Sequence, residues 1–289
     1  MTLVRGLTKD HLEIAGAGIN VAHAGSGPPV LLLHGYPETH GMWRHIAPIL
    51  AQEHTVVCPD LRGYGDSDTP PGGDDHIGYS KRAMAHDQVE VMRTLGFDRF
   101  AVAGHDRGAR VALRMTLDHP ETVTQLAILD IVPTAEIYAT IDQRRAMSVW
   151  RYFFLVQPFD LPERLIGRDP GFYLRWTLDE WSATPEAFPD EVLTEYERCF
   201  DPATIHATCE DYRAGATIDL EHDVADCDVP LRCPVLVLWS ERGLGSDYDV
   251  AGIWRSRAPD VTGHGMDCGH FLAEERPEET ATALRRFLR

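Results

Sequence analysis

The sequence predicts an α/β fold with a mostly parallel sheet, helices on both faces and an inserted helical cap. Short apolar runs alternate with helical patterns over the first part of the chain, which is typical of a parallel sheet. Residues 133–229 have mostly helical periodicity, many aromatic residues and repeated prolines. Strand signals return only at "CPVLVLWS". We therefore expect residues 1–132 and 230–289 to form the core and residues 133–229 to form the cap.

The first core elements follow from apolar patterning and glycine breaks. The section "HLEIAGAGINVAHAGSGPPV" alternates weakly and breaks at Gly-Ser-Gly-Pro-Pro, which predicts a hairpin. The runs "VLLLHG" and "HTVVCPD" are continuous and apolar, which is typical of strands buried on both faces. A glycine-rich loop, "LRGYGDSD", follows the second run. The stretch "KRAMAHDQVEVMRTLGF" predicts a helix that stops at Gly96.

The remaining core elements continue the alternation. "FAVAGHD" predicts a strand, "RGARVALRMTLDHP" a helix and "VTQLAILDIVP" another strand. After the cap, "CPVLVLWS" and "VTGHGM" predict two strands, and "PEETATALRRFLR" predicts a last helix. We expect the cap to cover the carboxyl edge of the sheet, because ligands bind at that edge in open α/β sheets.

Composition limits the partners and the compartment. A net charge of −18 at pH 7 argues against nucleic acid and anionic membranes as partners. The six cysteines form no CxxC pair, which indicates unpaired thiols in a reducing compartment. The start "MTLVRGLTKD" lacks the apolar stretch of a signal peptide, and no run is long enough to span a membrane. We expect a cytoplasmic protein. The histidines have no ligand-like spacing, so we expect no metal and no cofactor.

The segment "GHDRG" from Gly104 to Gly108 has the layout of a nucleophile elbow, a tight turn between a strand and a helix. Serine usually stands at the tip of this turn, but here the residue is Asp106. A carboxylate is ionised at neutral pH, so it can attack carbon without a general base and form an ester. We predict that Asp106 is a nucleophile; the alternative is that it only caps the following helix.

A late histidine completes the predicted catalytic group. His270 lies in "CGHF", after the last strand signal, in the order expected for the histidine of such a triad. We predict that it activates the water that hydrolyses the ester. Two acids could orient it: Asp130 ends the strand after the elbow helix, and Asp247 follows the "VLVLWS" strand. The spacing alone leaves both open.

Two arginines follow the predicted nucleophile. Arg107 is its neighbour, and Arg110 lies one helical turn further on, so both can point toward the substrate. A guanidinium group binds a carboxylate through two parallel hydrogen bonds and stays charged when buried. The pair therefore predicts a small acid as substrate. The alternative is that both arginines lie on the surface or in ion pairs.

Several motifs together carry a family resemblance. They are "HGYPETHGMW", "DLRGYGDSD", "KRAMA", "GHDRGAR", "RMTLDHP", "LDIVPT", "CEDYRAG" and "CGHF". In this order they resemble the α/β-hydrolase superfamily, and within it the fluoroacetate (haloacetate) dehalogenases of the aspartate-nucleophile branch. The resemblance covers almost the whole chain, including the cap. It implies an α/β-hydrolase fold, a hydrolytic dehalogenase without cofactor, a haloacid substrate and a homodimer.

The resemblance also implies roles for core residues. It assigns Asp130 the orienting role beside His270. In this fold, two backbone N–H groups stabilise the oxyanion of the ester intermediate. By motif position these are the amides of Tyr36 and Arg107.

In the cap, the family binds the leaving halide with a His-Trp pair and a later tyrosine. The tyrosine matches Tyr212. Arg151 and Tyr152 occupy the positions of the pair, so we expect them to serve the leaving group in a pocket of different shape and polarity. Trp181 is expected to line the same pocket.

Two other functions remain open. Tyr152 and Tyr212 are similar to the tyrosine pair that protonates the epoxide oxygen in epoxide hydrolases, which makes an epoxide hydrolase the alternative. A non-catalytic binding protein on the same fold is a third possibility, although candidates for nucleophile, histidine and acid are all present. A serine esterase is disfavoured because the elbow has no hydroxyl group.

Overall fold

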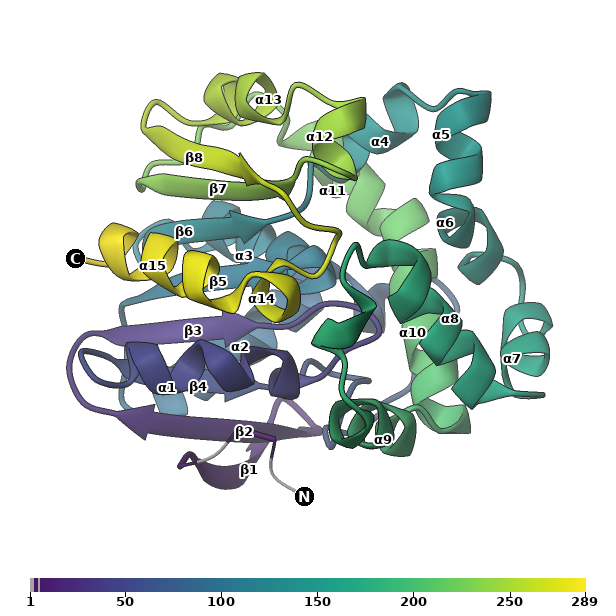
Figure 1. Cartoon of the computed structure of the whole chain (residues 1–289), viewed down its shortest axis with the longest axis horizontal. Helices are drawn as coiled ribbons and strands as arrows, with labels where there is room; N and C mark the ends of the chain where they lie inside the picture. Colours follow the sequence, from purple (N-terminus) through teal and green to yellow (C-terminus); the bar gives the residue numbers. More distant parts are fainter. Residues whose placement is uncertain (1–2, 5) are drawn as a thin grey trace.

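A sheet of eight strands forms the centre of the molecule (Figure 1). The computed structural model describes residues 3–4 and 6–289. The strand order is β1-β2-β4-β3-β5-β6-β7-β8, and β3 to β8 are parallel to one another. The strands are β1 (Thr8–Ile14), β2 (Ala17–Gly25), β3 (Pro29–Leu33), β4 (Thr55–Pro59), β5 (Phe100–His105), β6 (Val123–Leu129), β7 (Val235–Ser240) and β8 (Val261–Met266).

Helices cover both faces of the sheet. One face packs against α1 (Ala47–Leu50), α14 (Leu272–Glu275) and α15 (Pro277–Phe287). The other face packs against α2 (Lys81–Thr94), α3 (Asp106–Asp118) and α13 (Val250–Arg257). Because both faces are covered, the central strands β3 and β5 are almost continuously apolar.

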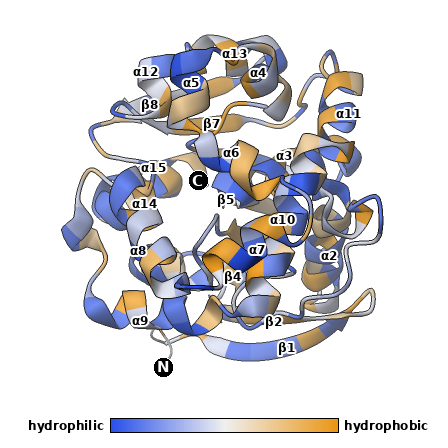
Figure 2. Cartoon of the chain, turned by 90° about the vertical axis from the view of Figure 1, so that its right-hand side faces the viewer, coloured by the Kyte–Doolittle hydropathy of each residue, from blue (hydrophilic) through white to orange (hydrophobic). Residues whose placement is uncertain are grey.

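Between β6 and β7 the regular elements of the chain are all helical. This helical insertion lies to the right of the sheet in Figure 1 and faces the viewer in Figure 2. Its helices are α4 (Thr134–Ala139), α5 (Gln143–Ser148), α6 (Trp150–Leu155), α7 (Leu161–Ile166), α8 (Pro170–Trp181), α9 (Asp190–Cys199), α10 (Pro202–Ala216) and α11 (Ile218–Ala225). The insertion leaves the sheet where β6 ends, so it covers the carboxyl ends of the strands.

The predicted fold class is confirmed, with differences in detail. The predicted hairpin is formed by β1 and β2, and it turns at Ala15 and Gly16 rather than at the later Gly-Ser-Gly-Pro-Pro break. That break instead connects β2 to β3. Gly96 has a φ of +90° just after α2, the left-handed conformation that stops a helix. Helix α13 had no sequence signal, because "VAGIWRSR" is short and mixed in polarity.

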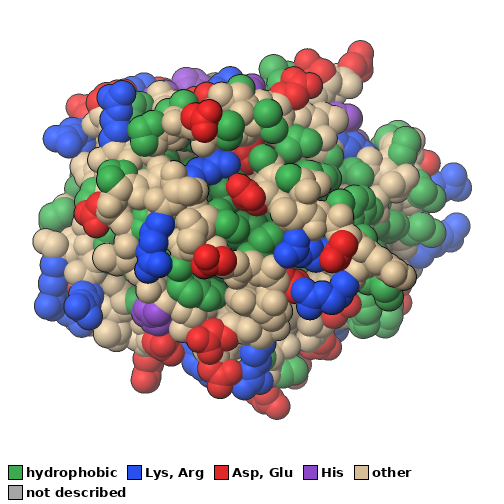
Figure 3. Space-filling view, turned by 90° about the horizontal axis from the view of Figure 1, so that it is seen from above, with side chains coloured by type: hydrophobic (Ala, Val, Ile, Leu, Met, Phe, Trp, Pro, Cys, Tyr) green, Lys and Arg blue, Asp and Glu red, His purple; other side chains and the backbone are tan. Residues whose placement is uncertain are grey.

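The surface carries side chains of both charges, interspersed on the face seen in Figure 3. Apolar side chains also gather at the end of the molecule formed by the helical insertion. Large exposed hydrophobic residues of the insertion are Met147, Phe159, Leu161, Leu165, Phe172 and Trp176. Exposed apolar surface of this kind is common at protein interfaces; the homodimer expected from the resemblance stays a prediction. Among the described residues, every helix is too short or too polar to cross a membrane.

Candidate active site

The turn between β5 and α3 has the geometry of an elbow. Asp106, the first residue of α3, has a φ of +43°, in the left-handed region that L-residues rarely adopt. Gly104 and Gly108 lie against each other on either side of the turn, and Gly108 also lies against the backbone of His34. A Cβ atom at either glycine would overlap these backbone atoms. The two glycines therefore permit the tight turn that raises Asp106 at the carboxyl end of the sheet.

Asp106 is buried but remains an anion. Its side chain is 3% exposed, and the backbone N–H of Tyr36 donates a hydrogen bond to its Oδ2 atom at 3.1 Å. Burial raises the pKa of the Asp106 carboxyl, but the charges of His270, Arg107 and other nearby cations outweigh burial and lower this pKa below its usual value. The carboxylate is therefore ionised at neutral pH. The N–H of Tyr36 lies within hydrogen-bond distance of this carboxylate, and the oxyanion role of the Tyr36 and Arg107 N–H groups stays a prediction.

His270 lies beside Asp106 with one ring nitrogen free. Its Nδ1 atom is 2.6 Å from Oδ2 of Asp130, and Oδ1 of Asp130 accepts the N–H of Ser240 at 2.7 Å. The Nε2 atom is buried and has no hydrogen-bond partner among the described residues. Asp130 therefore fixes the orientation of the ring, and Nε2 is left to accept a proton. Asp247, the other candidate acid, instead forms an ion pair with Arg144.

Arg107 is held by two neighbouring residues of α10. Its Nε and Nη2 atoms donate to the Asp211 carboxylate at 2.8 and 2.7 Å, and Nη2 also donates to the Asp211 carbonyl at 2.7 Å. The guanidinium carbon lies 4.3 Å from the centre of the Tyr212 ring. Lys81 and the hydroxyl of Tyr64 also bind the Asp211 carboxylate. Of the three guanidinium nitrogens of Arg107, only Nη1 has no hydrogen bond to the described residues. Arg107 is therefore less free to bind a substrate than the sequence indicates.

Arg110 connects the elbow helix to the helical insertion. Its Nη1 atom donates to Oγ1 of Thr134 at 2.6 Å, and its Nη2 atom donates to the hydroxyl of Tyr152 at 3.0 Å. Its Nε atom is buried without a partner in the described chain. The Tyr152 ring meets the Tyr212 ring edge to face at 5.5 Å, and the hydroxyl of Tyr212 is also buried without a described partner. Arg110 thus contacts Tyr152, which contacts Tyr212, and both Arg110 and Tyr212 have a buried donor without a described partner.

Most of the guanidinium group of Arg151 is enclosed by the helical insertion, and its expected role toward the leaving group stays a prediction. Its guanidinium carbon is 4.7 to 4.8 Å from the ring centres of Trp150, Trp176 and Trp181. It forms an ion pair with Glu180 on α8. A buried guanidinium needs a counter-charge and is stabilised over indole faces, and α8 supplies both. Trp181 packs against the imidazole of His270 with ring centres 5.2 Å apart, and its expected place in the leaving-group pocket stays a prediction.

Several side chains that shape this site had no separate signal in the sequence. Asp211 stands next to Tyr212 in "CEDYRAG", so its motif position could have drawn attention to it. The hydroxyls of Tyr36 and Tyr173 are buried without hydrogen-bond partners in the described structure. Burial raises the pKa of both phenols, so they stay protonated and can act as donors. No single motif signals Tyr173, because its contact with this region depends on how α8 packs.

A buried histidine–carboxylate pair lies beneath the nucleophile. Nδ1 of His105 is 3.2 Å from Oε2 of Glu38, and Nε2 of His105 donates to the carbonyl of His270 at 2.8 Å. Burial by itself would lower the pKa of His105, but the contact with Glu38 outweighs it and raises this pKa to about 9. At neutral pH the ring is therefore an imidazolium that forms an ion pair with Glu38 and donates a hydrogen bond to the His270 carbonyl.

The pair predicts a specific pH dependence of stability. The pKa of His105 is raised in the folded state, so protonation of His105 stabilises the fold. Its contribution to the free energy of unfolding is complete below pH 6.5 and is lost as the pH rises toward 9. Between pH 6.5 and 8.5 the free energy of unfolding should fall by about 2 kcal/mol through this group. Urea unfolding at both pH values measures this loss. In Glu38→Gln the fall should largely disappear, and an unchanged fall would contradict the assignment to His105.

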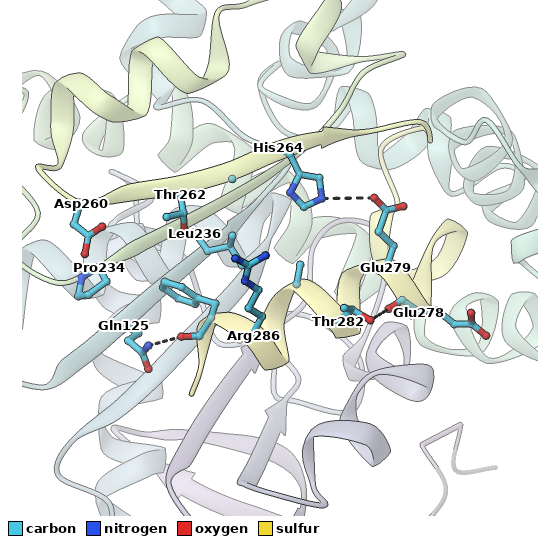
Figure 4. Close-up of a pocket in the computed structure, with 13 residues that line it drawn as sticks. Gln125, Pro234, Leu236, Asp260, Thr262, His264, Glu278, Glu279, Thr282 and Arg286 are labelled. Carbon is cyan, nitrogen blue, oxygen red and sulfur yellow. Dashed lines mark hydrogen bonds and ion pairs between the residues drawn. The ribbon is translucent and has the colours of Figure 1, made fainter.

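A groove of about 740 Å³ lies away from this site (Figure 4). It is formed by α15 and the first residues of β6, β7 and β8, including Gln125, Leu236 and Thr262. These are the amino ends of the strands, whereas Asp106 follows the carboxyl end of β5. The groove is therefore separate from the candidate active site. Among the described residues no group of histidine, cysteine and carboxylate side chains is placed to hold a metal ion.

Comparison with known proteins identifies the family. Residues 28–277 match the family model of the alpha/beta hydrolase fold. The chain is 45% identical to a fluoroacetate dehalogenase from Burkholderia sp., over 99% of this chain and 95% of the relative. It is 35% identical to a soluble epoxide hydrolase from Corynebacterium sp., over 97% of each chain. The crystal structure of a protein from Nostoc sp. has a TM-score of 0.96 and 56% identity, covering 98% of each chain. The chain therefore belongs to the alpha/beta hydrolase fold family.

Proposed function

We propose that this protein is a hydrolytic dehalogenase that acts on small 2-halo carboxylic acids of the haloacetate type. The observation that carries the proposal is a buried, ionised aspartate at the tip of the elbow, beside a histidine with a free Nε2 atom. The similarity to a fluoroacetate dehalogenase over nearly the full chain supports this substrate class.

The first step is displacement at carbon. One carboxylate oxygen of Asp106 attacks the α-carbon of the haloacid, the carbon–halogen bond breaks, and the halide leaves with the bonding electrons. The product of this step is an ester between Asp106 and the acid. A buried carboxylate is weakly hydrated, which favours attack when the α-carbon is held in line with it.

The second step is hydrolysis of the ester. His270 Nε2 takes a proton from water, and the resulting hydroxide attacks the carbonyl carbon of the Asp106 side chain. The N–H groups of Tyr36 and Arg107 stabilise the oxyanion. The intermediate collapses, the proton returns from His270 to the leaving alkoxide, and the 2-hydroxy acid is released. Asp130 stabilises the imidazolium that forms during this step.

Substrate binding follows from the donors left free around Asp106. Nη1 of Arg107 and Nε of Arg110 are unbonded, so they are the groups that bind the substrate carboxylate. The hydroxyl of Tyr212 is free for the leaving halide, and Tyr152, held by Arg110, closes the pocket beside it. No cofactor takes part in the proposed reaction.

The proposal is tested by halide release from chloroacetate, fluoroacetate and 2-chloropropionate, with product analysis. A single turnover in heavy-oxygen water should yield unlabelled 2-hydroxy acid and leave the label in Asp106, because the product hydroxyl comes from the carboxylate. Absence of halide release from every haloacid, with Asp106→Asn behaving like the wild type, would disprove the proposal.

The choice between the two candidate acids gives a prediction of its own. Asp130→Asn should reduce kcat for halide release about 10³- to 10⁴-fold, because the ring of His270 loses its orienting carboxylate. Asp247→Asn is the matched control: its ion pair with Arg144 is remote from His270, and kcat should change less than about twofold. Steady-state assays of both variants measure the difference. A larger effect at Asp247 would reverse the assignment.

An epoxide hydrolase is the second candidate. Two observations favour an epoxide hydrolase: the edge-to-face contact between the rings of Tyr152 and Tyr212, and the similarity to a soluble epoxide hydrolase. In that reaction Asp106 opens the epoxide, and a phenol protonates the departing oxygen. This function predicts diol formation from small epoxides that is lost in Tyr212→Phe, while haloacids release no halide. A non-catalytic binding role would give neither product.

A further inference from the structure

Arg151 joins two helices of the insertion from the inside. It lies on α6 and is fully buried. Its partners on α8 are Trp176, Thr177, Glu180 and Trp181, which fall on one face of that helix. The guanidinium is thus enclosed by indoles and bonded to a hydroxyl and a carboxylate, all but one from α8. This cluster fixes the position of α8 against α6.

The end of α8 holds the backbone of the histidine loop. The N–H of His270 donates to the carbonyl of Trp181 at 2.8 Å. The carboxylate of Glu275 accepts the N–H groups of Ala183 at 2.9 Å and of Gly269 at 3.0 Å, which joins the two segments. A Cβ atom at Gly269 would overlap backbone atoms of Trp181 and Ala183. The two segments are therefore in direct backbone contact.

The Trp181 side chain makes the same connection. The ring centre of the indole lies 4.7 Å from the guanidinium carbon of Arg151. The ring centres of Trp181 and His270 are 5.2 Å apart, and the two ring planes form an angle of 76°. The opposite side of His270 is held by Asp130 at 2.6 Å. His270 is consequently positioned from both sides, by the core through Asp130 and by the insertion through Trp181.

We infer that Arg151 is a positioning residue that holds His270 through α8 and Trp181, so that its loss slows ester hydrolysis more than halide departure. This inference rests on the proposed function, because it assigns Arg151 to one of its two steps. Two guanidinium nitrogens are bonded to Thr177 and Glu180, and indoles cover the faces of the group. The third nitrogen, Nη2, is buried without a hydrogen-bond partner in the described structure, so the halide step has to be measured separately from ester hydrolysis.

The inference is tested by separating the two steps in Arg151→Met. A rapid-quench experiment with chloroacetate measures the first burst of halide and, by mass spectrometry, the ester on Asp106. We expect a burst rate within about threefold of the wild type and ester hydrolysis at least tenfold slower, so that ester accumulates. Arg151→Lys, which keeps the cation among the indoles, should restore much of the hydrolysis rate.

Arg175→Met is the matched control. Arg175 also lies on α8, but its side chain is 43% exposed and pairs with Glu197 on the surface. Both steps should proceed at wild-type rates in this variant. A slowed halide burst without accumulated ester in Arg151→Met would show that Arg151 acts on the leaving group, and unchanged rates in both steps would show that it positions nothing. Either result overturns the inference.

A second measurement is independent of turnover. In Arg151→Met, hydrogen exchange should accelerate at the amide of His270, which donates to Trp181, but not in Arg175→Met. Unchanged protection of this amide would also overturn the inference. If the wild type forms no ester from any haloacid while this amide exchanges faster as expected, the proposed function fails and the positioning role of Arg151 stands.

Discussion

The variant His270→Ala is expected to release one equivalent of halide and then stop, with the acid bound as an ester to Asp106. The first step needs only the carboxylate, whereas the second needs a base for water. In this site the free Nε2 atom of His270 is that base. Loss of a catalytic histidine of this kind costs on the order of 10³ to 10⁶ in turnover.

The ester is detected by mass spectrometry of the whole chain and of the peptide containing Asp106, after incubation with chloroacetate. The peptide should gain the mass of one carboxymethyl group. His264→Ala is a suitable control, because His264 is on the exposed edge strand β8 and about half of its side chain is exposed. Full turnover by His270→Ala would show that another group activates the water.

The replacement of Asp106 is expected to abolish both steps. In Asp106→Gly and Asp106→Ala no carboxylate can attack carbon, so neither halide nor ester should form, a loss of at least about 10⁴-fold. The two variants should differ in stability. At a φ of +43° alanine is strained and glycine is not, so Asp106→Gly should be more stable than Asp106→Ala by about 1 kcal/mol.

Halide assays and urea unfolding of the two variants measure both effects. Since both variants lack the carboxylate, the difference between their free energies of unfolding measures the backbone strain at position 106 and contains no contribution from the lost charge. Equal stabilities would contradict a strained elbow, and residual halide release would point to another nucleophile. Such a strained residue is expected at a functional site, where local stability is lost in favour of a defined geometry.

The elbow could be predicted from the sequence because its requirements are local. Two glycines and one left-handed residue stand within five positions, between a buried strand and a helix, so a single segment carries the whole pattern. The strands of the core and its longer helices, but not α13, were predictable for the same reason. Their apolar periodicity reflects burial on one face or on both.

The surroundings of the arginines could not be predicted in the same way. Arg107 is neutralised by Asp211, 104 positions later, and Arg151 by Glu180, 29 positions later. Neither separation follows a helical or strand repeat, because the partners meet only when the helices of the insertion pack. Spacing alone also left the orienting acid open, because Asp130 and Asp247 both follow a strand; the choice of Asp130 came from the family resemblance, and the fold brings Asp130 to His270.

The contacts of Asp211 and Tyr212 with Arg107 limit how far α10 can move. Arg107 is the residue after the nucleophile, and Asp211 and Tyr212 both belong to α10 of the helical insertion. If α10 moved away from the core as a rigid body, the buried guanidinium of Arg107 would lose the carboxylate of Asp211, which costs several kcal/mol. We therefore expect α10 to stay in place over the nucleophile during turnover, and movements of individual side chains to admit the substrate and release the product.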